Sequence, residues 1–160
     1  MAIIKTANGH GKYRDLRTRN DLITYITDPQ KAQSGHIFYS MTNPHSPVED
    51  MNRVAEQFGK ADGVQARHFI FSFRCNEVNS LVAASCIAQD ITRYLGREFQ
   101  AVSAVHENTP ELHIHTVINS VSYLDGHRYY GTKAEFYRMK NGILHILQDY
   151  GVRRLDYVSS

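Results

Sequence analysis

The chain has 160 residues, of which 42% are hydrophobic and 21% are charged, and its formal net charge is +2. This composition fits one globular domain that buries a core, and it excludes a disordered chain. The small net charge does not by itself indicate a polyanionic partner, and the two cysteines, Cys75 and Cys86, exclude a disulfide framework.

The sequence gives no indication of a membrane or secretory location. It contains no apolar run close to the roughly 20 residues that span a membrane. Its first residues, MAIIKTANGHGK, lack the long apolar core of a signal peptide. We therefore expect a cytoplasmic protein that does not enter a membrane.

The chain begins with a predicted strand, AIIKT (2–6), followed by a basic loop that contains glycine. NDLITYITD (20–28) predicts a helix with Asn20 or Asp21 as its N-cap, and Pro29 ends it.

The middle of the chain alternates strands and helices. HIFYSMT (36–42) predicts a strand, and the segment 46–60 predicts a helix opened by Ser46 with a proline in its first turn. ARHFIFSF (66–73) has the β-branched and aromatic content of a strand. NSLVAASCIAQDITRYLG (79–96) predicts the clearest helix of the chain, capped by an asparagine or serine and ended by a glycine.

The last third predicts two strands, FQAVSAVH (99–106) and LHIHTVINSV (112–121), which the turn ENTPE joins. An Asp-Gly pair in YLDGHRYY (123–130) is typical of a short hairpin. The segment 133–151 predicts a final helix with a break near Gly142. Together the elements predict one α+β domain over residues 1–160, with a central antiparallel sheet of about five strands and helices packed on it.

Three histidines near the turn ENTPE indicate a metal site. His113 and His115 project from the same side of a strand because side chains alternate. The turn has a length that brings His106, on the neighbouring strand, beside them. Three neutral imidazoles leave coordination positions open for substrate, as catalytic metal sites do. The simpler alternative is that each histidine is a hydrogen-bonded polar residue on a half-exposed strand.

The stretch HENTPELHIHTVIN closely resembles the three-histidine motif of the relaxases, the mobilisation nucleases of conjugative plasmids and transposons. That family pattern is His, any residue, Asp, a spacer, then His-hydrophobic-His and usually an Asn. These places hold His106, Asn108, His113, His115 and Asn119.

Two further segments extend the resemblance from about Ile3 to Val152. YITDPQKA is similar to the family segment that carries the catalytic tyrosine, and here this residue is Tyr25. ARHFIFSFRCNE is similar to an intervening strand of the family, with His68 and Ser72 at matching places.

The resemblance implies a two-layer sandwich that nicks one DNA strand at a transfer origin by metal-dependent transesterification. Tyr25 would attack the phosphate and form a 5′-phosphotyrosine, and Asn108 would occupy the place of a catalytic aspartate. An amide cannot accept a proton at neutral pH, so Glu107 or Glu111 could replace that carboxylate. Because a phenol has a pKa near 10, the nucleophile needs activation.

The resemblance also implies the ligands of the protein. The metal would be Mg or Mn, with Zn as an alternative, held by the three histidines. Single-stranded DNA would be the substrate, with accessory relaxosome proteins and a secretion coupling protein as further partners in a bacterial cytoplasm. The expected DNA-binding residues are Lys12, Arg14, Arg17, Arg19, Ser72 and Asn119. Three tyrosines could stack on bases: Tyr123, Tyr129 and Tyr130.

Several alternatives stay open at this point. Replication initiators and transposases share the histidine pair, but their tyrosine tends to follow it. Histidine-triad nucleotide hydrolases need a third alternating histidine, where this chain has Val117. A DNA-binding module without catalysis would explain Asn108. Tyr13, in the basic loop, competes with Tyr25 as the nucleophile. Relaxases are commonly longer, so the 160 residues can be the N-terminal part of a larger protein.

Overall fold

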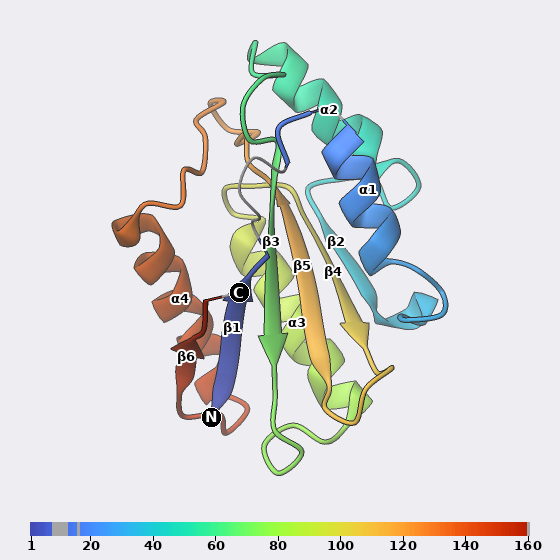
Figure 1. Ribbon diagram of the computed structural model, residues 1–160, viewed down its shortest axis with the longest axis vertical. Coiled ribbons are helices and arrows are strands. Elements are labelled where there is room, and N and C mark those ends of the chain that lie inside the picture. The colour runs from blue at the N-terminus through green and yellow to red at the C-terminus, as the bar shows by residue number, and fades with distance from the viewer. Residues whose placement is uncertain (8–12, 16, 160) are drawn as a thin grey trace.

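The computed structural model describes residues 1–7, 13–15 and 17–159. Six strands form one sheet in the order β2-β4-β5-β3-β1-β6 (Figure 1). The strands are β1 (Ala2–Thr6), β2 (Ile37–Ser40), β3 (Ala66–Ser72), β4 (Ala101–His106), β5 (His113–Asn119) and β6 (Leu155–Tyr157). The sheet and its helices confirm the predicted α+β class.

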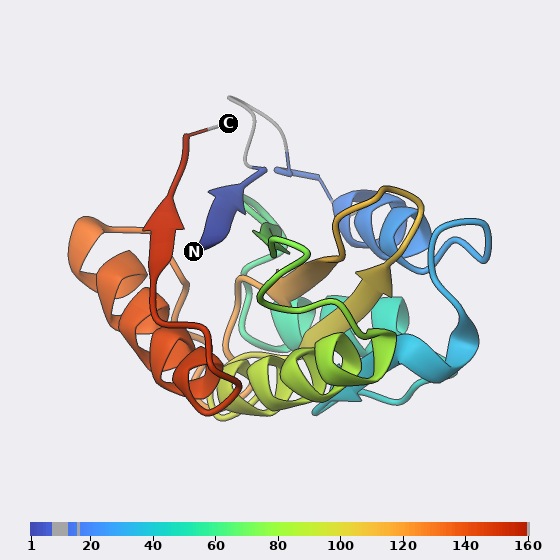
Figure 2. The ribbon, with the colours of Figure 1, turned by 90° about the horizontal axis from the view of Figure 1, so that it is seen from below.

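Four α-helices cover the two faces of the sheet. They are α1 (Arg17–Ile26), α2 (Pro47–Gln57), α3 (Leu81–Leu95) and α4 (Lys133–Gln148). Figure 2 shows α3 and α4 together on one face, with α1 on the opposite face. The helix α2 packs beside α1, because Met51 and Ala55 of α2 share a hydrophobic cluster with Leu22 and Ile23 of α1.

The alternation of side chains along β3 separates two cores. Phe69 and Phe71 point toward α3 and α4 and join the larger hydrophobic cluster. Ala66 points the other way and joins the smaller cluster under α1. The face under α1 therefore also receives His68, which lies two residues along the strand from Ala66.

The strands that carry the histidines lie in the middle of the sheet. β4 and β5 pair antiparallel with His106 directly opposite His113. β3 pairs antiparallel with β5 on its other side, with Ile70 opposite His115. Because both neighbours fix β5, the positions of its two histidines are set by complete ladders.

The sheet is mixed, and one strand was not expected. β6 pairs parallel with β1, with Leu155 beside Ala2 and Asp156 beside Ile3. The other five strands pair antiparallel, which confirms the predicted central antiparallel sheet of about five strands, and β6 adds a sixth strand at its edge. A strand of three residues is too short to show the alternation by which strands are recognised.

Two helix boundaries also differ from expectation. The helix α1 begins at Arg17, and Asp15 accepts a hydrogen bond from the Arg17 amide at 2.8 Å, so Asn20 and Asp21 lie inside the helix instead of capping it. The helix α4 runs unbroken through Gly142. A β-carbon at Gly142 would lie 2.1 Å from the Tyr94 hydroxyl oxygen, so this glycine permits close packing of α4 on α3.

The segment 123–130 forms a turn without two regular strands. An isolated bridge joins Val121 and Arg128, and the Ser122 amide donates to the His127 carbonyl at 2.8 Å. Gly126 has a positive φ of 77°, which agrees with the turn expected for the Asp-Gly pair. In the described part of the chain, no helix combines the length and hydropathy that a membrane crossing requires.

Candidate active site

His106, His113 and His115 converge on one point under α1. One nitrogen of each ring lies within 4.8 Å of the nitrogens of the other two. His106 and His115 stack with ring centroids 4.1 Å apart, and His113 lies 5.1 Å from His115 and 5.4 Å from His106. Three imidazoles at this spacing suit one divalent ion, and they leave room for further ligands. The structure therefore brings together the three predicted ligands.

Hydrogen bonds orient each of the three rings. His106 Nε2 donates to the Ile26 carbonyl at 2.8 Å, and His113 Nδ1 donates to the Glu111 carbonyl at 3.2 Å. His115 Nδ1 lies 2.8 Å from His68 Nε2. Metal-binding histidines commonly donate their second ring nitrogen in this way, which leaves the other nitrogen as a ligand. The contacts leave Nδ1 of His106 and Nε2 of the other two rings for the ion.

His68 is a fourth histidine that the ligand prediction did not include. Its side chain is only 4% exposed, and its ring stands 5.0 Å from that of His115. The family resemblance placed His68 at a matching position in a strand but gave it no role. Its contact with His115 depends on the pairing of β3 with β5. The period-two pattern of β3 could have placed His68 on the face opposite Phe69 and so beside the cluster.

Burial keeps the imidazoles of His68, His106 and His115 neutral. Desolvation, with a smaller contribution from His106, lowers the pKa of His68 to about 4. Desolvation and three neighbouring histidines lower the pKa of His115 to about 2, and burial also lowers the pKa of His106. Only neutral imidazole binds a metal ion, so the site is prepared for an ion at neutral pH.

Tyr25 faces the cluster from α1. Its ring centroid lies 5.8 Å from that of His115 and 6.3 Å from those of His68 and His106. Tyr25 is 46% exposed, so a substrate can reach its side chain. Lys31 Nζ lies over the Tyr25 ring, 3.7 Å from its centroid. The helix α1 thus brings a phenol to the histidines, and the turn that follows it brings a cation.

The alternative tyrosine lies in a different setting. Tyr13 donates its hydroxyl hydrogen to the Ala7 carbonyl at 2.5 Å and packs on the cluster under α1. Burial raises the pKa of its phenol. A nucleophilic phenol must ionise, so these contacts favour Tyr25.

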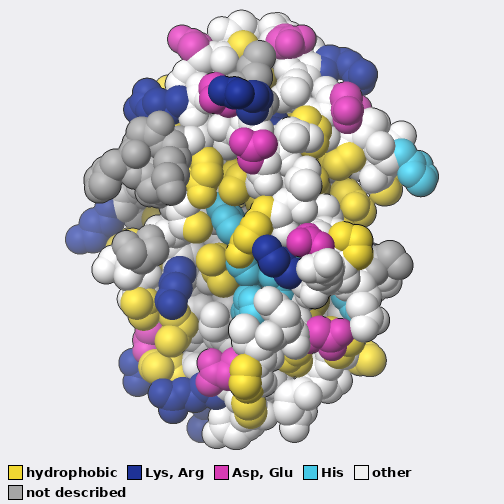
Figure 3. Space-filling view, turned by 45° about the vertical axis from the view of Figure 1, so that its right-hand side comes forward, with side chains coloured by type: hydrophobic (Ala, Val, Ile, Leu, Met, Phe, Trp, Pro, Cys, Tyr) yellow, Lys and Arg dark blue, Asp and Glu magenta, His cyan; other side chains and the backbone are white. Residues whose placement is uncertain are grey.

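The site opens on the molecular surface. Figure 3 shows histidine side chains at the floor of a depression, with hydrophobic and cationic side chains beside them. Ser72 lies on this face, opposite His113 in the β3–β5 ladder. Asn108 is exposed in the turn after β4, and within the described residues its side chain forms no hydrogen bond. Glu107 is also exposed and accepts from Gln33 at 2.8 Å.

Two of the expected DNA contacts are structural instead. Arg19 has no exposed surface and donates to Asn52 Oδ1 at 3.1 Å and to Asn119 Oδ1 at 2.9 Å. Asn119 is equally buried and donates to the Met51 carbonyl and to Gln100. Desolvation lowers the pKa of Arg19 to about 10, which leaves it charged at neutral pH. Neither side chain lies on a surface that DNA can reach, so the expectation of a DNA contact is wrong for both residues.

Two of the other expected DNA contacts lie at the start of α1, and the three tyrosines expected to stack on bases lie in the 123–130 segment. Arg14 and Arg17 are exposed, whereas Lys12 lies outside the described residues. Tyr130 is 66% exposed, but Tyr129 is buried. Tyr123 is half-buried and donates to the Gly96 carbonyl at 2.7 Å. Of the three tyrosines, only Tyr130 presents an open ring.

A tyrosine that faces a three-imidazole cluster on a mixed sheet places the protein among metal-binding domains of the His-hydrophobic-His class. Residues 25–152 match the family described as relaxase, MobA/VirD2-like, nuclease domain. The chain belongs to this relaxase family.

Two proteins of Escherichia coli, each named Protein TraI, are similar to the chain. One is 31% identical over 144 residues, which cover 84% of this chain and 19% of that protein. The other is 36% identical over 106 residues, which cover 62% of this chain and 14% of that protein. The chain thus spans less than a fifth of the length of these relatives.

Proposed function

We propose that the protein is a DNA relaxase that nicks one strand at a transfer origin and begins the conjugative transfer or mobilisation of a plasmid or transposon. One observation carries the proposal: the ring of Tyr25 lies about as far from His68 and His106 as from His115, at 5.8–6.3 Å. A phosphate between the tyrosine and the ion would contact both.

The donor set fits a divalent ion, because one nitrogen from each of three imidazoles converges within 4.8 Å. When bound, the ion would polarise a non-bridging phosphate oxygen and offset the charge that develops in the transition state. We propose Mg or Mn as the ion, with Zn as the alternative. His68 would hold the His115 ring in its orientation through the contact at Nδ1.

In the proposed reaction, the Tyr25 oxygen forms a bond to phosphorus while the bond from phosphorus to the 3′ oxygen breaks. The phenol loses its proton, and the departing 3′ oxygen gains one. The product is a 5′-phosphotyrosine that conserves the ester bond and so permits rejoining without ATP. Lys31 would stabilise the negative charge on the phosphate from its place over the Tyr25 ring.

DNA would approach along the face that carries the histidines. We propose that Arg14, Arg17 and Ser72 contact the DNA strand near α1. Lys12 is proposed as a further contact because it lies in the same basic segment of the sequence as Arg14 and Arg17. Cations at this entrance would bind phosphates and make affinity depend on salt. The accessory relaxosome proteins, the secretion coupling protein and the bacterial cytoplasm belong to the same proposal.

Tyr25→Phe tests the nucleophile because it removes one hydroxyl and keeps the packing of the ring. We expect the variant to bind single-stranded DNA and metal but to form no covalent adduct. Tyr13→Phe is the matched control and should form the adduct. Peptide mapping of the wild-type adduct should find DNA on Tyr25, and DNA on any other tyrosine would overturn the assignment.

The ligands are tested separately. His113→Ala or His115→Ala should abolish metal-dependent nicking while the fold remains, because the side chains act at the ion. Calorimetry should show weaker metal binding in each variant. Unchanged affinity in either one would contradict the site.

A further inference from the structure

Helices cover only part of the sheet face that carries the histidines. Under α1 and α2, residues of β4, β5 and the start of β3 join the smaller hydrophobic cluster, among them Val117 and Ala66. Farther along β3 this cover ends, since His68 is only 4% exposed, whereas Ile70 and Ser72 are partly exposed. Figure 2 shows α1 over the β4 side of the sheet and not over β1. The same face is therefore open from the histidines toward β1.

A row of side chains leads from the ligands across this open face to β1. His115 lies opposite Ile70 in the β3–β5 ladder, and Ile70 lies opposite Lys5 in the β1–β3 ladder. Residues directly opposite one another in an antiparallel pair project from the same face. Neighbouring β-strands lie about 4.8 Å apart, so the row places the backbone of Lys5 about 10 Å from that of His115. A DNA strand bound at the histidines therefore reaches Lys5 without leaving this face.

The neighbouring row runs from His113 through Ser72 to Ile3 and makes the open face partly apolar. We call the four residues beyond the ligands the β1 shelf: Ile3, Lys5, Ile70 and Ser72. Ile3 and Ile70 are partly exposed, and in the described part of the chain they belong to neither hydrophobic cluster. Ile4, which points to the other face, has no exposed surface. A solvated sheet face ordinarily carries polar side chains, so the two isoleucines here leave apolar surface beside the ligands for a bound molecule.

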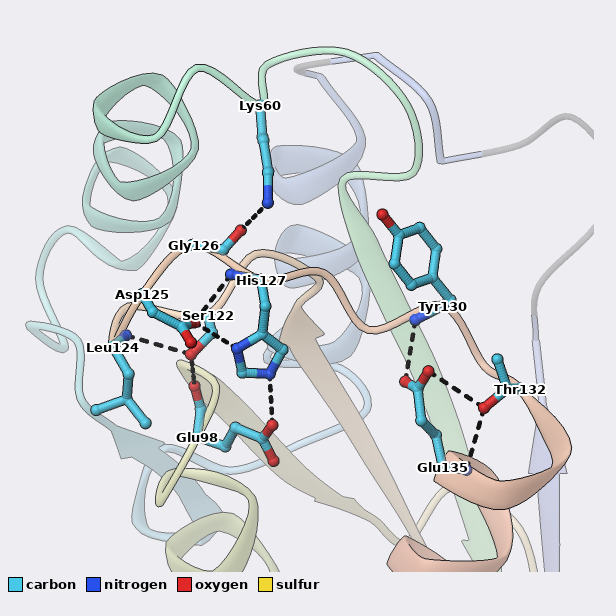
Figure 4. A network of polar contacts seen from close by, with 10 residues as sticks. All are labelled: Lys60, Glu98, Ser122, Leu124, Asp125, Gly126, His127, Tyr130, Thr132 and Glu135. Carbon is cyan, nitrogen blue, oxygen red and sulfur yellow. Dashed lines mark hydrogen bonds and ion pairs between the residues drawn. The ribbon is translucent and has the colours of Figure 1, made fainter.

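Lys5 brings an unpaired positive charge to the β1 shelf. Its side chain is exposed, and among the described residues its ammonium takes part in no hydrogen bond or ion pair. Lys60 differs, because its ammonium donates to the Gly126 carbonyl in the network that Figure 4 shows. On the far side of β1, the carboxylate of Asp156 in β6 pairs with Arg154 at 3.2 Å. This carboxylate is thus neutralised, and the charge of Lys5 is left to attract an anion.

We propose that the β1 shelf binds the nucleotide next to the cleaved phosphate, with Lys5 on the phosphate of that nucleotide and Ile3 and Ile70 against its sugar and base. Contacts to phosphates fix the position of a strand without reading its sequence. Lys5 is therefore a positioning residue, which aligns the cleaved phosphate between Tyr25 and the ion. The inference rests on the proposed function, because it takes single-stranded DNA as the substrate.

The first test uses an oligothymidylate of about 16 nucleotides as the probe, which is the upper end of the usual site size. Acetylation of the protein with and without this probe, read by mass spectrometry, reports which lysines the strand covers. We expect Lys5 to react at least about five-fold more slowly in the complex, because its ammonium is bound to a phosphate. Lys133 on α4 is the matched control, since it is also exposed but lies on the other side of the sheet, and its rate should not change. Equal protection of both lysines, or of neither, would overturn the proposal.

The second test measures how the affinity for the same probe, labelled with fluorescein, depends on salt. Each phosphate contact to a single strand contributes about −0.7 to the slope of log affinity against log salt concentration. Lys5→Gln should therefore make the slope less steep by about 0.7. Lys5→Arg should keep the wild-type slope, and so should the control Lys133→Gln. An unchanged slope in Lys5→Gln would overturn the phosphate contact, because a lysine with a purely structural role leaves this slope unaltered.

The apolar contact is tested by Ile70→Ala with the same labelled probe. This substitution should weaken binding by about three-fold or more and leave the salt slope unchanged, because it removes apolar surface and no charge. Ile70→Val keeps most of that surface and should bind nearly as well as the wild type. Unchanged affinity in Ile70→Ala would overturn the contact with sugar and base. Calorimetry should find full metal affinity at the histidines in every variant, which confirms that each is folded.

The outcomes separate the two proposals. If the wild type binds the probe while Lys5 stays unprotected and Lys5→Gln keeps the slope, the shelf proposal fails and the relaxase proposal stands. Failure of the wild type to bind any single strand overturns both. Protection of Lys5 together with a less steep slope in Lys5→Gln supports the path of the strand from the histidines to β1.

Discussion

At the scale of single residues, Lys31 is a cation that lies over the ring of the proposed nucleophile. Its Nζ lies 3.7 Å from the Tyr25 ring centroid. We expect Lys31→Gln to slow adduct formation by about 10- to 100-fold, because a charge aimed at the phosphate is lost. Lys31→Arg should recover part of the rate. Single-turnover adduct assays measure this, and metal affinity should be unchanged; an unaltered rate in Lys31→Gln would exclude the role.

Asn108 occupies the place of the family's aspartate, in the exposed turn two residues after His106. We expect Asn108→Asp to preserve or raise the yield of adduct, because it adds a carboxylate beside the ligands. Calorimetry must accompany the assay, since a carboxylate can also tighten metal binding. Loss of cleavage with fold and metal affinity intact would show that the amide has a role of its own.

The histidines could be predicted from the sequence because strand alternation and a short turn determine their positions. The role of Arg19 could not be predicted, because its partners Asn52 and Asn119 are far away in the chain. A basic residue in a basic loop indicates a solvated surface or a phosphate contact. Only the packed structure shows that this guanidinium is buried among amides.

At the scale of secondary-structure elements, Arg19 ties α1 to α2 and β5. We expect Arg19→Met to lower the free energy of unfolding by about 2–4 kcal/mol, because the substitution leaves buried amide oxygens without a donor. The matched control is Arg17→Met on the exposed side of α1. This substitution should change the free energy of unfolding by less than about 0.5 kcal/mol. Denaturant unfolding measures both.

The same variant tests whether the docking of α1 matters to the chemistry. Arg19→Met should keep its metal affinity, because the three ligands belong to β4 and β5. Its adduct formation should fall, because α1 carries Tyr25. Equal loss of metal binding and adduct would mean that the substitution damages the whole domain.

Most elements could be predicted because each has its own periodic pattern and boundary residues. The strand β6 could not, because three residues carry no period and its partner β1 lies at the other end of the sequence. Gly142 favoured a break in α4, since glycine is a poor helix former. The glycine is instead explained by tertiary packing, because Tyr94 on α3 lies too close for a larger side chain at position 142.

At the scale of the whole molecule, buried histidines make stability depend on pH. His68 has a pKa of about 4 in the folded protein, against about 6.5 in an unfolded chain. Between these values the unfolded state binds more protons, so stability is complete above pH ~6.5 and falls as the pH decreases toward ~4. The difference corresponds to about 3 kcal/mol for this group alone.

We therefore expect the free energy of unfolding of the metal-free protein to decrease on acidification through this range. His68→Gln should reduce the slope, and the remaining slope should reflect His115 and His106, whose pKa values are also lowered. Denaturant titrations in chelator, repeated at several pH values, provide the measurement. Equal slopes for the wild type and the variant would show that His68 is not titrating.

The pairing of β1 with β6 has a consequence for how the chain folds. Residue 2 pairs with residue 155, so one of the closing contacts of the sheet joins segments separated by nearly the whole chain. Contacts of this kind form late and slow folding, because loop closure precedes any gain from pairing. The histidines and Tyr25 lie between residues 25 and 115, on α1, β4 and β5. A ribosome therefore delivers every residue of the proposed nuclease centre before it delivers the strand that borders the sheet.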